Sequence, residues 1–112
     1  MISNCNSVTI WVVKAPKIEN LLEQIKTCIE ESRYLDTSHA DKRQKERKVS
    51  RPEILYVLKN GRHEKAKDKF DENYQTWNYA VRGKTLDLKE LRIIVSFDEN
   101  LMLIITAIHL EA

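Results

Sequence analysis

Three side chains spaced four residues apart could carry phosphoryl chemistry. His39, Arg43 and Arg47 have the spacing i, i+4, i+8, which places them on one stripe if their segment is helical. An imidazole can take or give a proton near neutral pH, and guanidinium groups can hold a phosphate and stabilise charge that grows in a transition state. The alternative interpretation is an exposed basic helix with an incidental histidine, because such charge patterns are common on surfaces.

Two polar residues inside otherwise uncharged stretches are further candidates. Arg82 is the only charged residue of the stretch 76–82, and Thr106 is the one polar residue of 101–108. If the Arg82 side of its strand faces the segment with His39, the arginine would join that stripe. The alternatives are a solvent-facing arginine and a hydroxyl that bonds a neighbouring group within a sheet.

The sequence contains no metal or nucleotide signature. Neither His63 nor His109 has a Cys or His partner at metal-ligand spacing, and there is no Walker loop, GxGxxG or GxSxG pattern. We therefore expect a protein without a metal or another cofactor. If His39 is one proton-transfer group, the candidates for a second are Tyr34, Tyr79, Glu46 and His63, and the sequence does not rank them.

The net charge of +2 hides an uneven distribution. Residues 39–69 hold 11 Lys or Arg and 5 Asp or Glu, a local charge of +6, and the rest of the chain holds 8 and 12, a local charge of −4. This asymmetry is typical of a basic face for a polyanion such as nucleic acid. A solvated charged surface without a ligand is the plainer interpretation.

Length and composition predict one domain, 1–112, with a small core. The chain has 112 residues, of which 42% are hydrophobic. No apolar run reaches the ~18 residues that span a bilayer, and the apolar stretch 8–13 is too short for a signal-peptide core. We expect a cytoplasmic protein without membrane contact, with Cys5 and Cys28 reduced and Cys28 buried on a helix.

Hydrophobic periodicity predicts helices in the first half of the chain. Residues 17–33 alternate apolar and polar faces at helical spacing. A second helix is expected over about 38–48, on the surface. A third should begin after Ser50, which can form a capping box with Glu53, and end at Asn60-Gly61.

The second half of the chain has the alternation of β-strands. We expect an edge strand over 62–70, a half-buried strand over 76–82, and a nearly apolar hairpin of 91–97 and 101–110. These elements predict an α+β fold in which N-terminal helices pack on one face of a roughly four-stranded antiparallel sheet.

Several short motifs occur in an order that is typical of one protein family. They are Ser38-His39-Ala40, Arg43, Glu46-Arg47, Val49-Ser50, the helix from Glu53 to Gly61, and Ile104-Ile105-Thr106-Ala107. In this arrangement residues 37–110 resemble domain-of-unknown-function family 4258. The resemblance leaves residues 1–36 as an N-terminal extension with its amphipathic helix.

The family is grouped with the barnase–EndoU–colicin–RelE (BECR) superfold of ribonuclease toxins. The resemblance thus implies a RelE- or barnase-like fold and a metal-independent endoribonuclease of bacterial toxin type, which cleaves RNA by attack of the 2′-hydroxyl on the adjacent phosphate. It implies that His39 is a general base or acid, that Arg43, Arg47 and Arg82 bind the scissile phosphate, and that Thr106 orients it. The implied partners are RNA and an antitoxin or immunity protein.

Two other hypotheses about function give the same residues different roles. A non-catalytic module of the same fold would use its basic face to bind RNA or an acidic protein, and its binding would depend on salt but survive loss of His39. A protein-interaction domain with no nucleic-acid role would carry the basic region as a solubilising surface.

Overall fold

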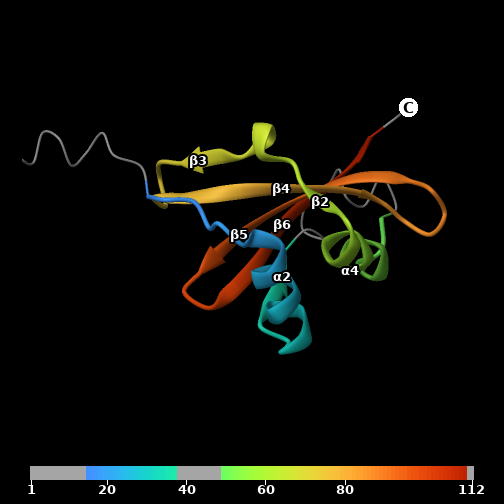
Figure 1. Ribbon diagram of the computed structural model, residues 1–112, viewed down its shortest axis with the longest axis horizontal. Coiled ribbons are helices and arrows are strands. Elements are labelled where there is room, and N and C mark those ends of the chain that lie inside the picture. The colour runs from blue at the N-terminus through green and yellow to red at the C-terminus, as the bar shows by residue number, and fades with distance from the viewer. Residues whose placement is uncertain (1–14, 38–48, 111–112) are drawn as a thin grey trace, which may run out of the picture.

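The computed structural model describes residues 15–37 and 49–110. Its elements in chain order are α2 (Leu21–Glu30), β1 (Tyr34–Asp36), α4 (Arg51–Asn60), β2 (Arg62–His63), η2 (Lys65–Lys67), β3 (Lys69–Asp71), β4 (Thr76–Lys84), β5 (Glu90–Asp98) and β6 (Leu101–Leu110). These elements form an α+β fold (Figure 1). The apolar stretch 8–13 and the helix expected over 38–48, with His39, Arg43 and Arg47, lie outside the described residues.

The sheet is larger than expected and mixed in direction. The described part of the chain forms six strands in the order β1-β6-β5-β4-β2, with β3 also paired to β4. β4, β5 and β6 are the antiparallel meander that alternation predicted, but β1 pairs with β6 in parallel. The expectation of a purely antiparallel sheet of about four strands was therefore wrong.

β1 arises because the first helix is shorter than the expected 17–33. Ser32 has a positive φ of 56°, and the Arg33 N–H donates to the Cys28 carbonyl at 2.7 Å, a bond that closes the helix end. The chain then reverses, and the Met102 N–H donates to the Arg33 carbonyl at 3.0 Å. The three residues that follow pair with the edge of β6.

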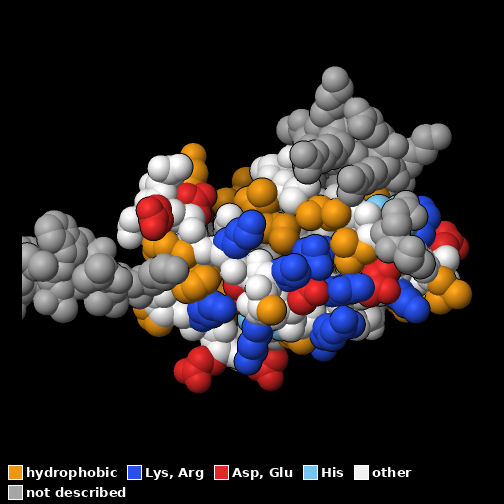
Figure 2. All heavy atoms as spheres, turned by 90° about the horizontal axis from the view of Figure 1, so that it is seen from above, with side chains coloured by type: hydrophobic (Ala, Val, Ile, Leu, Met, Phe, Trp, Pro, Cys, Tyr) orange, Lys and Arg blue, Asp and Glu red, His pale blue; other side chains and the backbone are white. Residues whose placement is uncertain are grey.

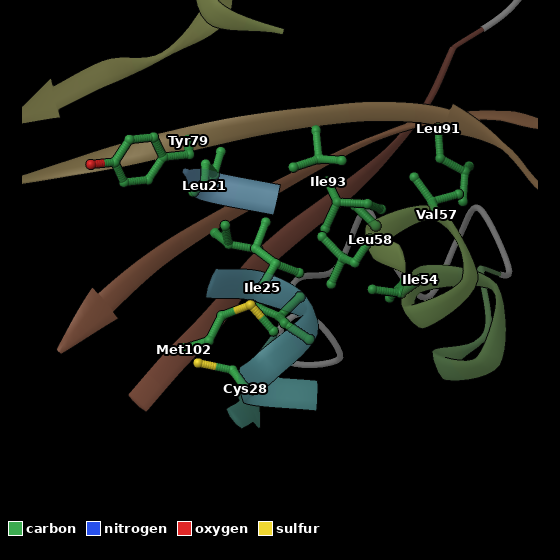
Figure 3. Packing of buried hydrophobic residues seen from close by; sticks show 14 residues of the cluster. Leu21, Ile25, Cys28, Ile54, Val57, Leu58, Tyr79, Leu91, Ile93 and Met102 are labelled. Atoms are coloured by element: carbon green, nitrogen blue, oxygen red, sulfur yellow. The ribbon is translucent and has the colours of Figure 1, made fainter. Parts of the chain in front are cut away.

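Both helices pack on the same face of the sheet (Figure 1). The core lies between them and the inward side chains of β4, β5 and β6, among which are Tyr79, Ile93 and Met102 (Figure 3). Cys28 is fully buried there, as its helical position predicted, and burial raises the pKa of its thiol. The opposite side of the sheet carries no α-helix from the described segments.

The third predicted helix is present as α4, with both hydrogen bonds of the Ser50–Glu53 capping box. Gly61 follows it, but in an extended conformation rather than the left-handed one. Glycine is needed here for a close approach, because a Cβ at Gly61 would lie 2.6 Å from the Arg82 carbonyl oxygen and 2.7 Å from that of Val57. The glycine thus lets the end of α4 contact β4.

The expected edge strand over 62–70 is divided into β2, η2 and β3, and Asp68 holds the parts together. Its carboxylate, which is fully shielded from solvent, accepts from the Ala80 N–H at 3.0 Å and so replaces a missing ladder bond on β4. The same carboxylate lies 2.8 Å from His63 Nε2 and 3.0 Å from Lys17 Nζ. Asp68 therefore joins β4, β2 and the segment that precedes α2.

We expect Asp68→Ala to lower the free energy of unfolding by about 3 kcal/mol, because it leaves the Ala80 N–H, the Lys17 ammonium group and the His63 imidazole without their shared partner. Chemical denaturation measures this change. Asp87→Ala, at an exposed position in the β4–β5 turn, is the control and should change stability by less than about 0.5 kcal/mol. Equal stabilities of the two variants would contradict this role of Asp68.

Candidate functional site

The face of the sheet opposite α2 and α4, which we call the open face, carries two of the predicted site residues. Arg82 follows the core residue Val81 on β4 and points away from the helices, toward Glu64 and Glu90. Thr106 on β6 is in register with Ile94 of β5, on the same face. His39, Arg43 and Arg47 fall in 38–48, so only Arg82 and Thr106 of the five predicted residues are placed.

Arg82 belongs to a cluster of four charged side chains. It is in register with Arg92 on the neighbouring strand, and Glu64 lies between the two guanidinium groups. Arg92 donates to Glu64 through Nε at 2.7 Å and Nη2 at 3.3 Å, and Arg82 Nη1 donates to Glu64 at 3.2 Å. Arg82 Nε also donates to Glu90. Two like charges directly opposite each other in a sheet are unfavourable, and the two carboxylates offset this repulsion.

The cluster keeps its carboxylates ionised. The hydrogen bonds from Arg92, and then those from Arg82, lower the pKa of Glu64 although partial burial opposes the shift. Arg82 lowers the pKa of Glu90, and Glu90 followed by Glu64 raises the pKa of Arg82. The side chains of Glu64 and Arg92 are 16% and 18% exposed, so the pair is largely buried but accessible from solvent.

A basic hollow adjoins this cluster. It has a volume of ≈ 340 Å³ and is lined by Lys67, Lys69, Asn78, Arg92, Ile94 and Ile108. Lys69 is the direct cross-strand partner of Asn78, so β3 contributes a cation to the same face. Figure 2 shows Lys and Arg side chains gathered over this side of the molecule with apolar side chains between them. The arrangement suits an extended anion with apolar parts.

The described candidates for a second proton-transfer group lie away from the open face. Tyr79 is buried on the helical side, where its hydroxyl accepts from the Ile18 N–H at 3.0 Å. His63 is bound to Asp68, and Tyr34 packs against the core. Glu46 lies outside the described residues. The fold places two carboxylates beside Arg82, those of Glu64 and Glu90, and Glu64 also accepts hydrogen bonds from Arg92.

Sequence reasoning missed Glu64, Arg92, Lys67 and Lys69. A signal for Arg92 was present, because it is the lone charge inside the apolar stretch 91–97, the same criterion that selected Arg82. The other three could not be assigned to a face, since the segment 62–70 was taken as one regular strand. Its division at η2 sets which side chains point toward Arg82.

A larger hollow of ≈ 570 Å³ lies on the helical side between α2 and α4. It is lined by Lys26, Glu30, Pro52, Leu55, Tyr56, Lys59 and Asn60. No charged cluster comparable to that around Glu64 occurs among these residues. We therefore place the candidate site on the open face, where charge and hollow coincide.

Comparison with known proteins connects this site to a family. The model of a domain of unknown function, DUF4258, matches residues 37–109, which is more than half of the chain. The chain belongs to the DUF4258 family. The matched region begins before α4 and contains β2 to β6, so the open face of the sheet is built almost entirely from the DUF4258 domain.

The other two comparisons give no match: neither a curated protein nor a solved structure is significantly similar to this DUF4258 chain. Within residues 15–37 and 49–110, no group of three or more His, Cys, Asp or Glu side chains is arranged to hold a metal ion. Neither helix of this part of the chain is long and apolar enough to cross a membrane.

Proposed function

We propose that this DUF4258 protein is a metal-independent endoribonuclease of bacterial toxin type and that RNA binds along the open face. The observation that carries the proposal is the cluster of Arg82, Arg92 and Glu64. It combines two cations that can hold a phosphate with a carboxylate that can accept a proton. Arginine is suited to this task because its planar fork matches two phosphate oxygens at once.

The basic hollow supports RNA as the substrate. A phosphodiester at Arg82 and Arg92 would have Lys67 and Lys69 beside it for a neighbouring phosphate. The apolar side chains Ile94 and Ile108 would contact the ribose. Thr106, one strand beyond Arg92 on the same face, orients the scissile phosphate in this proposal.

The reaction needs one proton acceptor and one proton donor. Glu64 takes the proton of the 2′-hydroxyl as that oxygen attacks the adjacent phosphorus. The bond from phosphorus to the 5′-oxygen then breaks, and His39 gives its proton to the leaving oxygen. The products are a 2′,3′-cyclic phosphate and a 5′-hydroxyl. Arg82 and Arg92, with Arg43 and Arg47 from the His39 segment, stabilise the negative charge that grows on the phosphate oxygens.

Substrate binding would make Glu64 a better base. In the free protein the two arginines lower its pKa, which keeps it ionised but weakly basic. A bound phosphate competes for the same guanidinium N–H groups and adds a negative charge nearby. Both effects raise the pKa of the carboxylate toward the range in which it accepts a proton effectively.

The BECR relationship and the toxin role are part of this proposal. The helices on one face of an antiparallel meander, with charged side chains on the opposite face, support a likeness to RelE or barnase at the level of architecture. A toxin of this type requires a neutralising antitoxin or immunity protein, and such a protein would have to cover the open face.

We expect Arg92→Gln to weaken RNA binding about tenfold at low salt. The slope of log affinity against log salt should become shallower by about 1, which is the contribution of one phosphate contact. Fluorescence anisotropy with a labelled RNA measures both quantities. Arg51→Gln, which removes a cation from the start of α4 on the helical side, is the matched control and should have little effect. If both variants weaken binding equally, RNA does not bind specifically at the open face.

Cleavage of RNA by the purified wild-type chain in EDTA tests the proposed activity. We expect fragments with 2′,3′-cyclic phosphate and 5′-hydroxyl ends, because the attacking oxygen belongs to the substrate. Fragments with 5′-phosphate ends would contradict the mechanism. If the folded protein binds RNA without cutting it, the non-catalytic RNA-binding module of the same fold is the better description.

A further inference from the structure

A second hollow lies beside the basic one on the open face. Its volume is ≈ 480 Å³, and its lining differs from that of the basic hollow: Asp71, Tyr74, Thr76, Asn78, Ser96, Phe97, Asp98, Leu103 and Ile105. Asn78 lines both hollows, so they adjoin each other. On β3 the charge changes sign between Lys69 in the first hollow and Asp71 in the second, two residues or about 6.6 Å apart.

Ser96 points to a ligand in the second hollow. It is only 5% exposed, and its hydroxyl makes no hydrogen bond within the segments that the structure describes. Buried hydroxyl groups are almost always paired, because leaving one without a partner costs free energy. Thr85, the other buried polar residue of the described chain, does have its partner, since its hydroxyl accepts from the Lys89 N–H. Ser96 thus has an unused donor and acceptor in the wall of a hollow.

The remaining lining residues select the kind of ligand. Leu103 and Ile105 provide an apolar floor, and Tyr74, which is 80% exposed, provides an aromatic ring at the rim. When it is ionised, the Asp98 carboxylate accepts hydrogen bonds but cannot donate one. A flat ring that has N–H donors on its edge would satisfy all three features. An anion would be repelled by the two carboxylates and belongs in the neighbouring hollow instead.

We propose that this second hollow binds a nucleobase with an exocyclic amino group, and that the phosphate of the same strand lies in the basic hollow. This inference rests on the proposed RNA-binding role of the open face. The amino group donates to Asp98, the Ser96 hydroxyl bonds the ring edge, and Tyr74 stacks on the base. Adenine, cytosine and guanine have such an amino group. Uracil offers only its ring N3–H, and the two carbonyl oxygens that flank this N–H are repelled by a carboxylate, so the hollow discriminates against uracil.

Binding of 2′-O-methyl RNA octamers tests the inference, because the blocked 2′-oxygen prevents cleavage during the measurement. We expect the wild-type chain to bind oligo(A) and oligo(C) about tenfold more tightly than oligo(U), as one charge-assisted hydrogen bond allows. Asp98→Asn should remove most of this preference. Glu72→Gln, a carboxylate in the neighbouring turn that does not line the hollow, is the matched control and should keep it.

Ser96→Ala separates ligand binding from a structural role. Because the hydroxyl has no partner in the described chain, its removal should leave the stability of the free protein unchanged or raise it. Affinity for oligo(A) should nevertheless fall about threefold to tenfold. Unchanged affinity in this variant, together with equal wild-type binding of all three octamers, overturns the base-binding inference and leaves the proposed function standing. If the folded wild type binds none of the octamers, the proposed RNA-binding role falls and the inference falls with it.

Discussion

Glu64→Gln should reduce RNA cleavage by roughly a hundredfold or more while RNA binding persists. Loss of a positioned general base typically costs 10²- to 10⁴-fold in rate. The substitution keeps the shape of the side chain but removes a negative charge from between Arg82 and Arg92, so both arginines remain free to hold a phosphate. Single-turnover cleavage and anisotropy, measured on the same preparations, separate the two effects.

The control for this variant is Glu90→Gln, because Glu90 also pairs with Arg82 but does not contact Arg92. Its cleavage rate should stay within about threefold of wild type, a change of well under 1 kcal/mol in the barrier. The pH profile gives a further check. The base must be ionised, so kcat/KM should fall as pH drops through the Glu64 pKa, which Arg92 and Arg82 hold below its usual value. An unchanged acid limb in Glu64→Gln would contradict the role of Glu64.

His39→Ala should also lower cleavage of RNA by roughly a hundredfold or more, through loss of the general acid. The acid must be protonated, so wild-type activity should fall as pH rises through the histidine pKa, whose ordinary value is about 6.5. In the variant this alkaline limb should disappear. Rate measurements across neutral pH, in EDTA, provide the comparison.

A substrate with a better leaving group distinguishes the acid from the base. Cytidine 3′-(4-nitrophenyl phosphate) releases a nitrophenolate that leaves without protonation. We therefore expect His39→Ala to cleave it at nearly the wild-type rate, whereas Glu64→Gln should remain slow, because the 2′-hydroxyl must still lose its proton. If the rescue occurs for Glu64→Gln instead, the two roles are reversed. If neither variant loses activity on RNA, neither residue takes part in proton transfer.

The spacing of apolar residues predicted those helices and strands that are determined by the residues of their own segment. The capping box at Ser50, the alternation of β4 and the apolar hairpin of β5 and β6 are all present as expected. β1 could not be predicted because its pairing depends on Ser32, which adopts a positive φ without being a glycine. The division of 62–70 depends on Asp68, whose carboxylate takes the place of a backbone group on β4. A side chain that takes the place of a backbone hydrogen-bond partner leaves no periodic signal in the sequence.

The candidate site was predictable only where one residue broke an apolar pattern. Arg82 and Thr106 were selected in this way, and both lie on the open face. Glu64 sits in a lysine-rich stretch in which nothing in the composition distinguishes it, and its importance comes from its position between two arginines. Ser96 is a single small polar residue in an apolar strand, and the absence of a partner for its hydroxyl within the described residues required coordinates.

Backbone amide chemical shifts of the isotope-labelled protein, followed during titration with 2′-O-methyl RNA, test most directly whether the open face binds RNA. We predict that the largest changes occur at Lys69, Asn78, Arg92 and Ile108, with little change at Lys26 and Tyr56 in the hollow between the helices. Changes confined to α2 and α4, with the strand residues unaffected, would contradict the assignment of the open face as the functional surface.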